Sequence, residues 1–529
     1  MFFHKITILI ITYIIDIYDI LINFGYDNDE RGMPMNKTKK LYTNLQKNID
    51  TIKQMNGNSC DINSRIIHFK KNTVAYMYIE SVASDDKVSD FLMRSLSEDV
   101  KDEIKLSTNK VYQRLKDTIL NSKMRTVEDF DNLFYFLSSG FTVIFIDGNS
   151  SAIALETKSV LDRGVTEAND EKNLRGPKDS FTENYMMNLG LIRKRIKDPH
   201  LWLNETIVGR RSKTKVAVAY LQDVVPQEKV EKIVNKLKKI DIDGILDCGY
   251  ILEYLSPKQY TDFPKAVTTE RPDLVCGSIL DGKIAIIVEN SPYVIVLPGL
   301  FMDFFQTADD YYQKPSNVTL SRALRFLAFL TTIMTPALYI AVTTFNQEII
   351  PDRLLISIAV QREGVPIPTI FEILILITTF EILRESDIRI PSAMGSSISI
   401  VGALVLGDAA VNAGIVSPIV VIVVAMTSIS GFLFTDIDFI NALRFWRVIF
   451  LIASAIMGLV GFVVIGIIFL TKICSLEIMG TPYLTPLSPL NQAILKDGLV
   501  RRARNKIKYR PDFFTKKNRR RLGVDQSEI

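Results

Sequence analysis

The sequence is poor in the residues from which most metal centres and catalytic triads are built. It contains only three histidines, and its four cysteines, Cys60, Cys248, Cys276 and Cys474, lie far apart with no CxxC spacing between them. Zinc sites and disulfide frameworks both show characteristic spacings of these residues. A GxGxxG turn after a strand, a GxxxxGK[ST] phosphate loop and a GxSxG nucleophile turn are also missing. We therefore expect no metal, no cofactor and no enzymatic activity.

Charged residues are scarce between about residue 324 and residue 474, whereas the first 300 residues have a mixed composition. The mean hydropathy of the whole chain, +0.16, is high for a soluble protein because of this apolar block. A helix needs about 20 apolar residues to cross a bilayer. Five segments come close to this length: 324–344, 366–383, 392–411, 415–434 and 447–474. We predict about four to six membrane helices, with an amphipathic interfacial helix between the first two segments.

Positive charges beside the apolar segments indicate how the chain is oriented. The basic stretches 384–390 and 443–447 both fall on the cytoplasmic side if the soluble half is cytoplasmic. A fifth full span would then place the very basic tail on the opposite side, against the same rule. This leaves two alternatives: one segment re-enters the membrane without crossing it, or the number of spans is even. On the cytoplasmic side, the tail would attract anionic lipid headgroups.

The region before the apolar block contains two related segments. Thr73–Leu92 aligns without a gap with Lys215–Val234, and Gly140–Leu155 aligns with Gly282–Leu297 at the same offset. Each unit has the pattern of a strand, a turn, an amphipathic helix, a further helix and two strands joined by a tight turn. A constant offset over about 80 residues is the signature of an internal repeat. We predict two tandem α/β subdomains of similar fold.

These patterns divide the chain into five parts. Residues 1–59 form an N-terminal leader and helix, in which Met35 is the expected start of the working protein and 1–34 an additional leader. The first α/β subdomain covers 60–180, and the second covers 181–310 with a basic helical linker. A transmembrane domain covers 320–475, and 476–529 is an interfacial segment with a basic tail. The expected fold class is a soluble α/β region of two tandem similar subdomains, followed by an all-α polytopic transmembrane domain.

The linker between the α/β units is strongly basic. Ser180 and Glu183 have the spacing of a capping box, which predicts a helix from about residue 181. No aromatic residues interleave the charges as single-stranded nucleic-acid binders require, so we expect no nucleic-acid partner. A solvated face or a contact between domains or subunits is the better interpretation, and the residues concerned are Arg193, Arg195, Arg210 and Arg211.

Acidic residues within the apolar block are the clearest functional candidates. Glu372, Glu381 and Asp408 lie in segments predicted to cross the membrane. An acid at membrane depth is costly unless it faces protein or water, so it often marks an ion path. In a ring of identical subunits, one such acid per chain would form a ring of carboxylates that favours cations. The alternative is a buried acid that accepts hydrogen bonds from neighbouring side chains, and the sequence leaves both open.

The stretch 391–418 around Asp408 is rich in glycine and other small residues. Small residues allow helices to approach closely in a bilayer. We therefore assign helix packing, or the lining of a conduit, to four of them: Gly395, Gly402, Ala403 and Gly407.

Several longer motifs resemble one known family. They include RGPKDSFTENYMMNLGLIRKRIKDPHL (175–201), VGRRSKTKVAVAYL (208–221), FFQTADDYY (304–312), REGVPIPTIFEILILITTFEILRESDIRIP (362–391) and SIVGALVLGDAAVNAGIVSP (399–418). Together and in this order they resemble the A subunit of GerA-type spore germination receptors, a family that also includes SpoVAF proteins. The resemblance covers nearly the whole chain from about residue 59 to residue 497.

This resemblance implies a multi-pass protein of the inner membrane of the dormant endospore. The A subunit is expected to form a homo-oligomer, a pentamer by the resemblance, and to act as a gated cation channel that triggers germination. Its expected partners are a transporter-like B subunit, a lipoprotein C subunit and membrane lipids. Members of the family often carry glutamine where Asp408 stands, which sets the need for that acid in doubt.

Two other functions stay open on the sequence alone. One is an accessory channel protein similar to SpoVAF. The other is a secondary transporter with its site at Asp408, which would predict inverted repeats and about ten or more spans.

Overall fold

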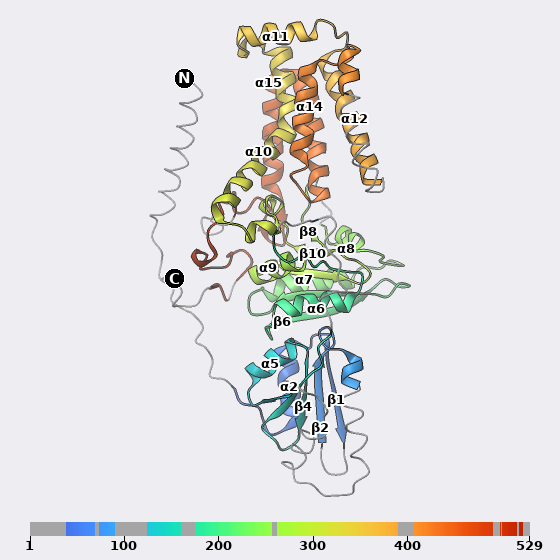
Figure 1. The fold of residues 1–529 in the computed structure, drawn as a ribbon, viewed down its shortest axis with the longest axis vertical. Coiled ribbons are helices and arrows are strands. Elements are labelled where there is room, and N and C mark those ends of the chain that lie inside the picture. The colour runs from blue at the N-terminus through green and yellow to red at the C-terminus, as the bar shows by residue number, and fades with distance from the viewer. Residues whose placement is uncertain are drawn as a thin grey trace.

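The computed structural model describes residues 39–68, 73–89, 124–159, 171, 175–256, 262–389, 407–489, 498, 500–515 and 518–521. The predicted leader therefore lies outside the described residues. Figure 1 shows an elongated molecule in which two α/β units and a helical bundle follow one another along the long axis. The described end of the chain returns to the level at which the second unit meets the bundle. The predicted fold class, two similar α/β units followed by a helical region, is confirmed.

The first α/β unit is built on a five-stranded antiparallel sheet with the order β1-β2-β4-β5-β3. Helices α2 and α5 cover one face of this sheet and form its main hydrophobic core. The elements are α2 (Leu45–Met55), β1 (Ile62–His68), β2 (Thr73–Ile79), β3 (Met124–Val127), α5 (Phe130–Ser138), β4 (Phe141–Ile146) and β5 (Ala152–Glu156). Helix α2 precedes the predicted boundary at residue 60, so the first unit begins earlier than the sequence suggested.

The second unit has the same strand order, β6-β7-β9-β10-β8, and buries both faces of its sheet. Helices α6 and α9 pack on one face and α7 and α8 on the other, with a separate core on each side. The elements are α6 (Tyr185–Arg195), β6 (Leu201–Val208), β7 (Thr214–Leu221), α7 (Gln227–Lys238), α8 (Cys248–Leu255), β8 (Val267–Thr269), α9 (Pro272–Asp281), β9 (Ile284–Val288) and β10 (Val294–Leu297). Two covered faces explain why β7, β9 and β10 are almost continuously apolar.

The two units repeat each other in register as well as in strand order. Val74 pairs with Ile146 in the first sheet, and Val216 pairs with Val288 in the second, so both strands of each pair keep the offset seen in the sequence. A left-handed glycine lies just beyond the end of each second helix, Gly140 (φ 83°) after α5 and Gly282 (φ 95°) after α9. The predicted duplication is therefore confirmed.

The first helix of each unit is also repeated, at a slightly shorter offset than the strands. Asn44 caps α2 by accepting from the Lys47 backbone N–H, and Asn184 caps α6 in the same way. The capping box predicted at Ser180 is wrong, because α6 begins at Tyr185 and the Ser180 hydroxyl instead donates to Glu270. Asparagine is as good an N-cap as serine, so the two could not be ranked from the sequence.

The helical part contains two helices that are long and apolar enough to cross a membrane, within the described ranges: Pro315–Phe345 and Ile437–Ser475. The connector from the second unit consists of η1 (Phe301–Phe305) and η2 (Ala308–Tyr311). The bundle consists of α10 (Pro315–Ile340), η3 (Ala341–Phe345), η4 (Gln347–Ile349), α11 (Asp352–Arg362), α12 (Thr369–Arg389), α14 (Pro418–Gly431) and α15 (Ile437–Ser475). The short strands β11 (Glu477–Ile478) and β12 (Thr481–Pro482) and η5 (Arg504–Lys506) follow. Helix α11, predicted as an interfacial helix, lies across the end of the bundle farthest from the α/β units.

Helix α15 reverses direction at Gly458, where φ is 59° and ψ is −140°. In a straight helix Trp446 and Phe469 would lie about 35 Å apart, at about 1.5 Å per residue. Their ring centroids are 4.9 Å apart, so the two halves of α15 run antiparallel. A Cβ at Gly458 would meet Phe345 at 2.7 Å, which explains the need for glycine at this position. The single span predicted over 447–474 is therefore part of a helical hairpin.

Candidate functional site

Glu372 lies at the far end of the bundle, in the first turn of α12. Its side chain is fully buried, and its Oε2 accepts hydrogen bonds from the Ser417 backbone N–H (2.9 Å) and hydroxyl (3.0 Å). Ser417 immediately precedes α14, whose first N–H groups have no partner within the helix. A carboxylate at this position is stabilised by those N–H groups and by the helix dipole. Glu372 therefore connects α12 to the start of α14.

The second oxygen of this carboxylate is less well satisfied. Glu372 Oε1 is buried and has no hydrogen-bond partner, and the nearest cation, Arg362 Nη2, is 3.8 Å away. Arg362 closes α11, so this loose ion pair joins α11 to α12. The contact orders the far end of the bundle.

Glu381 lies more than two turns further along α12 and contacts a different helix. It forms ion pairs with Arg444 (2.9 Å) and Arg447 (2.8 Å), both on the first half of α15. The Arg447 side chain is 5% exposed, so the pair compensates a buried cation. In the sequence, 443–447 is a basic stretch beside a predicted membrane segment, and because these residues belong to α15, the partners of Glu381 were missed.

Asp408 differs from both glutamates. It is exposed on the short helical stretch 407–412 before α14, and no hydrogen bond or ion pair joins it to another described side chain. Gly407 faces α14, where a Cβ would lie 4.0 Å from Val421. Gly395, Gly402 and Ala403 lie outside the described residues. The three acids are therefore not brought together within one chain: two of them hold helices together, and only Asp408 projects from the bundle.

The four arginines predicted to make domain or subunit contacts have different surroundings. Arg193 is fully buried and reaches across to the first unit. Arg195 binds Asp179 (2.6 Å) within the linker. Arg210 and Arg211 are exposed, and their ion pairs with Asp241 and Asp243 stay within the second unit. Of these four arginines, Arg193 alone joins the two units within one chain.

The contact between the α/β units is centred on Asp61, and we call the contacts made by residues 55–61 with the second unit the seam. Asp61 accepts from Arg193 Nε and Nη2, both at 2.8 Å, and from the Ser81 hydroxyl at 2.8 Å. Trp202 Nε1 donates to the Met55 carbonyl (2.9 Å), and its ring covers Gly57. Burial raises the pKa of the nearby Cys60 thiol to about 12, which keeps it protonated and unreactive. The seam therefore joins the two units through buried polar contacts.

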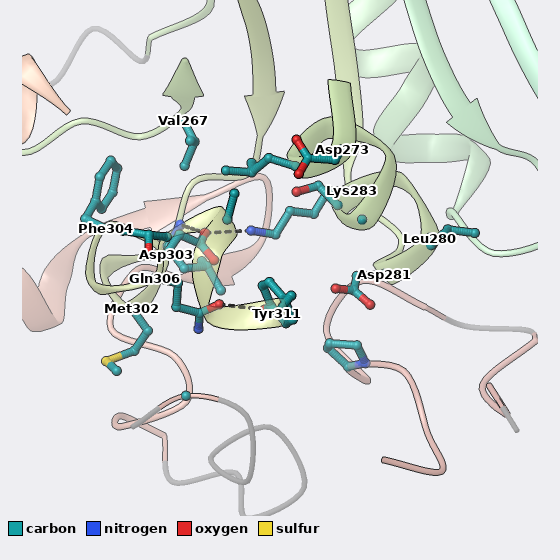
Figure 2. Close-up of a pocket in the computed structure, with 18 of the residues that line it drawn as sticks. Val267, Asp273, Leu280, Asp281, Lys283, Met302, Asp303, Phe304, Gln306 and Tyr311 are labelled. Carbon is teal, nitrogen blue, oxygen red and sulfur yellow. Dashed lines mark hydrogen bonds and ion pairs between the residues drawn. The ribbon is translucent and has the colours of Figure 1, made fainter. Parts of the chain in front are cut away.

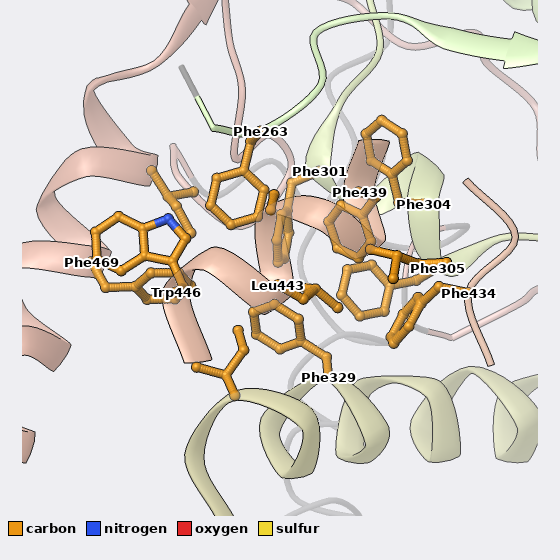
Figure 3. Packing of buried hydrophobic residues seen from close by; sticks show 14 of the residues in the cluster. Phe263, Phe301, Phe304, Phe305, Phe329, Phe434, Phe439, Leu443, Trp446 and Phe469 are labelled. Atoms are coloured by element: carbon orange, nitrogen blue, oxygen red, sulfur yellow. The ribbon is translucent and has the colours of Figure 1, made fainter. Parts of the chain in front are cut away.

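An aromatic cluster joins the second unit to the bundle (Figure 3). Phe304 of η1 stacks on Phe439 of α15 at 4.9 Å, and Phe301 lies 5.4 Å from Phe329 of α10. Phe263, from the chain between α8 and β8, lies 6.0 Å from Phe439 and 6.0 Å from Phe469, so it touches both halves of the α15 hairpin. Such close packing transmits a displacement of one element to its neighbours. We call this aromatic cluster the junction.

Buried ion pairs surround the junction. Asp310 of η2 is 2% exposed and binds Arg322 Nε (2.8 Å) and Arg325 Nη1 (3.0 Å) of α10. Burial alone would raise the pKa of Asp310, but the hydrogen bonds from the two arginines hold it below its ordinary value. Lys472, near the end of α15, binds Asp262 beside Phe263. The connector is therefore fixed to the start of α10, and the segment before β8 is fixed to the end of α15.

A cavity of about 480 Å³ opens beside the junction (Figure 2). Its walls come from the second unit, η1 and η2, the start of α15 and the C-terminal tail. Lys283 binds Asp303 (2.6 Å) on one wall, and the Tyr311 hydroxyl donates to Gln306 (2.9 Å) on another. Burial raises the pKa of Glu171 to about 7, so this carboxyl group titrates near neutral pH. Over the described part of the chain, no three acidic, cysteine or histidine side chains are placed to hold a metal ion.

Comparison with known proteins places these features in a family. The model of the Bacillus/Clostridium GerA spore germination protein family matches residues 50–513, which covers both α/β units, the bundle and most of the tail. Spore germination protein KA of Bacillus subtilis (strain 168) is 39% identical over 485 residues, 91% of this chain and 89% of that protein. Stage V sporulation protein AF of the same organism is 29% identical over 92% of this chain and 99% of that protein.

One solved structure is similar to half of this chain. It is the crystal structure of the N-terminal domain of the A subunit of the Bacillus megaterium spore germinant receptor GerK3. The identity is 30% and the TM-score 0.41, over 50% of this chain and 99% of that domain.

Proposed function

Because this chain belongs to the GerA family of spore germination proteins, we propose that it is a membrane subunit of a germinant receptor that oligomerises as a gated cation channel and triggers spore germination. The observation that carries the proposal is the family match over one continuous chain in which the second of two joined α/β units is packed onto a helical bundle. The proposed partners are further copies of this chain, a pentamer by resemblance, a transporter-like B subunit, a lipoprotein C subunit and membrane lipids. Nucleic acid is not among the proposed partners.

The proposed location is the inner membrane of the endospore, with the α/β units on the cytoplasmic side. The reversal at Gly458 supports an even number of spans. Helices α10, α12 and α14, the two halves of α15 and the span predicted over 392–411 would together cross the membrane six times. The basic tail then lies on the same side as the α/β units, which satisfies the positive-inside rule that five spans would break.

The ion path that we propose uses Asp408 rather than all three acids. Glu372 and Glu381 already contact Ser417 and two arginines within the chain. A carboxylate that serves a cation path must remain available to the ion. Asp408 is exposed in the single chain, and five copies would bring five such groups around an axis. Gly407, with Gly395, Gly402 and Ala403 of the same small-residue stretch, would line or pack beside this path.

The experiment is reconstitution of the full chain in liposomes with single-channel recording. The chain should assemble into a defined oligomer by native mass spectrometry and pass potassium and sodium in preference to chloride. Asp408→Asn should lower the cation conductance, whereas Asp241→Asn, the same change on an exposed residue of the second unit, should leave it unchanged. Monomers without conductance would refute the channel. Equal currents for both variants would refute only the role of Asp408.

The match to stage V sporulation protein AF favours a second candidate, an accessory channel protein of the same family. The two candidates differ in their assembly partners. Purification of the tagged chain from spores should recover B and C subunits if the chain is a receptor subunit. Recovery of the chain without them, with conductance retained, would favour the accessory channel.

A further inference from the structure

In the first turns of α10, charged side chains are buried and apolar side chains are exposed, the opposite of what is usual for a helix in water. Arg322 and Arg325 turn inward, where they are 0% and 14% exposed and bind Asp310. Leu320, Leu324 and Leu327 turn outward and are 64%, 50% and 57% exposed. Their spacing places the three leucines on one face of the helix. In water the arrangement would be the opposite, so this face is built to meet an apolar medium.

The basic tail is fixed to the same turns of α10. The Arg501 backbone N–H donates to the Thr319 hydroxyl (3.2 Å), and Arg322 Nη1 donates to the Gly498 carbonyl (2.7 Å). The Arg501 guanidinium binds the Gln313 and Tyr311 carbonyls just before α10. Figure 1 shows this dark red segment beside the lower end of α10. The tail and the leucine face are therefore neighbouring parts of one surface.

Several other side chains of this tail segment are exposed, and Arg504 lies over the Tyr311 ring at 4.9 Å. Residues 500–510 contain six lysines and arginines and no acid. Arg501 and Arg510 are bound to backbone carbonyls, whereas Arg504, Lys506 and Lys508 are exposed. Val500 and Tyr509 are exposed among them, at 42% and 45%. Cations interleaved with exposed apolar groups are typical of segments that lie at a membrane interface.

We propose that the leucine face of α10 and the tail segment 500–510 together form a binding surface for anionic phospholipid. The acyl chain would lie on Leu320, Leu324 and Leu327, which continue into the apolar outer surface of the bundle. The phosphate headgroup would meet Arg504, Lys506 and Lys508. Two features select this occupant over a second copy of the chain: the apolar face continues that of the membrane helices, and residues 500–510 beside it carry basic side chains and no acid. The inference rests on the proposed membrane location.

Lipid occupancy of this surface would also act on the junction. The tail contacts α10 through Arg501 and the second unit through Arg510, which donates to the Leu280 carbonyl (2.8 Å). A headgroup held by the residues between them would fix both contacts at once. The anionic lipid would therefore favour one relative position of the second unit and α10.

The test uses the full chain in detergent, with lipid added and bound lipid counted by native mass spectrometry. Phosphatidylglycerol should bind more tightly than phosphatidylcholine. Lys506→Gln with Lys508→Gln should weaken phosphatidylglycerol binding roughly 25-fold at low salt, because each base near an anionic surface contributes about 1 kcal/mol and about 1.4 kcal/mol is a factor of ten. Lys232→Gln with Lys238→Gln, the same charge change on the exposed face of α7, is the control and should bind like the wild type.

Each result separates this inference from the channel proposal. Leu320→Ala with Leu324→Ala should weaken binding of both lipids and leave the copy number unchanged. A changed copy number with unchanged lipid binding would show that a second copy covers this face, and would overturn the inference. Equal binding of the two lipids, or full displacement of phosphatidylglycerol by inorganic phosphate, would also overturn it. Conductance measured on the same samples tests the channel proposal independently. Lipid selectivity can be absent while currents persist, and currents can be absent while lipid selectivity persists.

Discussion

Replacement of Asp61 by asparagine tests whether the two α/β units are held together by one buried ion pair. Asp61 and Arg193 are both 0% exposed, and two hydrogen bonds of 2.8 Å join them. Asparagine preserves the size of the side chain but leaves the Arg193 cation buried without a counter-charge. The Ser81 hydroxyl also loses a charged acceptor. We therefore expect the seam to open before either unit unfolds.

The expected magnitude follows from the burial of the pair. Removing one partner of a buried ion pair typically costs about 3–5 kcal/mol, which corresponds to a shift of about 10²- to 10⁴-fold in the opening equilibrium. The double substitution Asp61→Leu with Arg193→Met removes both charges and should cost less than Asp61→Asn alone. The control Asp241→Asn breaks an exposed pair and should cost less than about 1 kcal/mol.

Trp202 provides the assay, because its indole N–H bonds to Met55 across the seam. The chain has two tryptophans, so a Trp446→Phe background leaves Trp202 as the single reporter. Urea titration of the full chain in detergent should show its emission shift at lower denaturant in Asp61→Asn than in the parent. If Asp61→Asn and Asp241→Asn lower the urea midpoint equally, the ion pair does not hold the seam. The same conclusion follows if the double variant loses as much unfolding free energy as Asp61→Leu and Arg193→Met lose together when made singly.

Three further predictions concern the junction and the bundle. Gly458→Ala should prevent the reversal of α15, because φ is 59° and a Cβ would meet Phe345 at 2.7 Å; a thermal unfolding midpoint equal to that of the wild type would contradict this. Cys474, which is exposed at the end of the hairpin, should react with an impermeant maleimide from the same side of the membrane as a cysteine placed at Lys238; labelling from opposite sides would exclude an even number of spans. The pKa of Asp310 is lowered in the folded state, so its contribution to stability should be complete above its ordinary value near 4 and should be lost as the pH falls below it. Asp310→Asn should remove that part of the acid dependence, as measured by unfolding midpoints between about pH 3 and pH 6.

The α/β repeat could be predicted because its determinants are local and occur twice. Apolar positions such as Val74 and Val216 indicate the strand register, and Gly140 and Gly282 mark where the helices before them end. Each position alone is weak evidence, but the constant offset makes them confirm one another. The start of the first unit was missed because the offset between the two copies is shorter at α2 and α6 than in the strands, so these helices fall outside the gapless alignment.

The α15 hairpin could not be read from composition. A turn in water is marked by polar residues, because its free backbone groups meet solvent. The reversal at Gly458 lies in a continuous apolar run, and its free backbone N–H is met by a distant side chain, since Leu459 N–H donates to Asn346 Oδ1 (3.4 Å). Three closely spaced glycines, Gly458, Gly461 and Gly466, were the available signal, but glycine is also common in uninterrupted membrane helices.

The partners of the buried acids were beyond sequence reasoning for a similar reason. Glu381 and Arg447 are 66 residues apart, and Glu372 and Ser417 are 45 apart. Neither spacing has a local pattern, so an acid in an apolar segment supported an ion path and a structural contact equally well. In the folded chain Glu372 and Glu381 contact neighbouring helices, and an acid that already holds two helices together is costly to release.

The arrangement of the contacts limits how a signal could pass from the α/β units to the bundle. Two units tied by a buried ion pair cannot hinge at low cost, so any displacement of the first unit moves the second with it. The second unit meets the helices through Phe263 and the η1 phenylalanines, which touch α10 and both halves of α15. A ring that contacts both arms of a hairpin cannot follow one arm without displacing the other. Motion at the junction would therefore tilt the α15 hairpin as a unit against α12, where Glu381 binds Arg444 and Arg447. If the chain is the channel proposed above, Glu381 would act in its gating rather than in its ion path, because the ion pairs of Glu381 must break or move whenever the hairpin tilts.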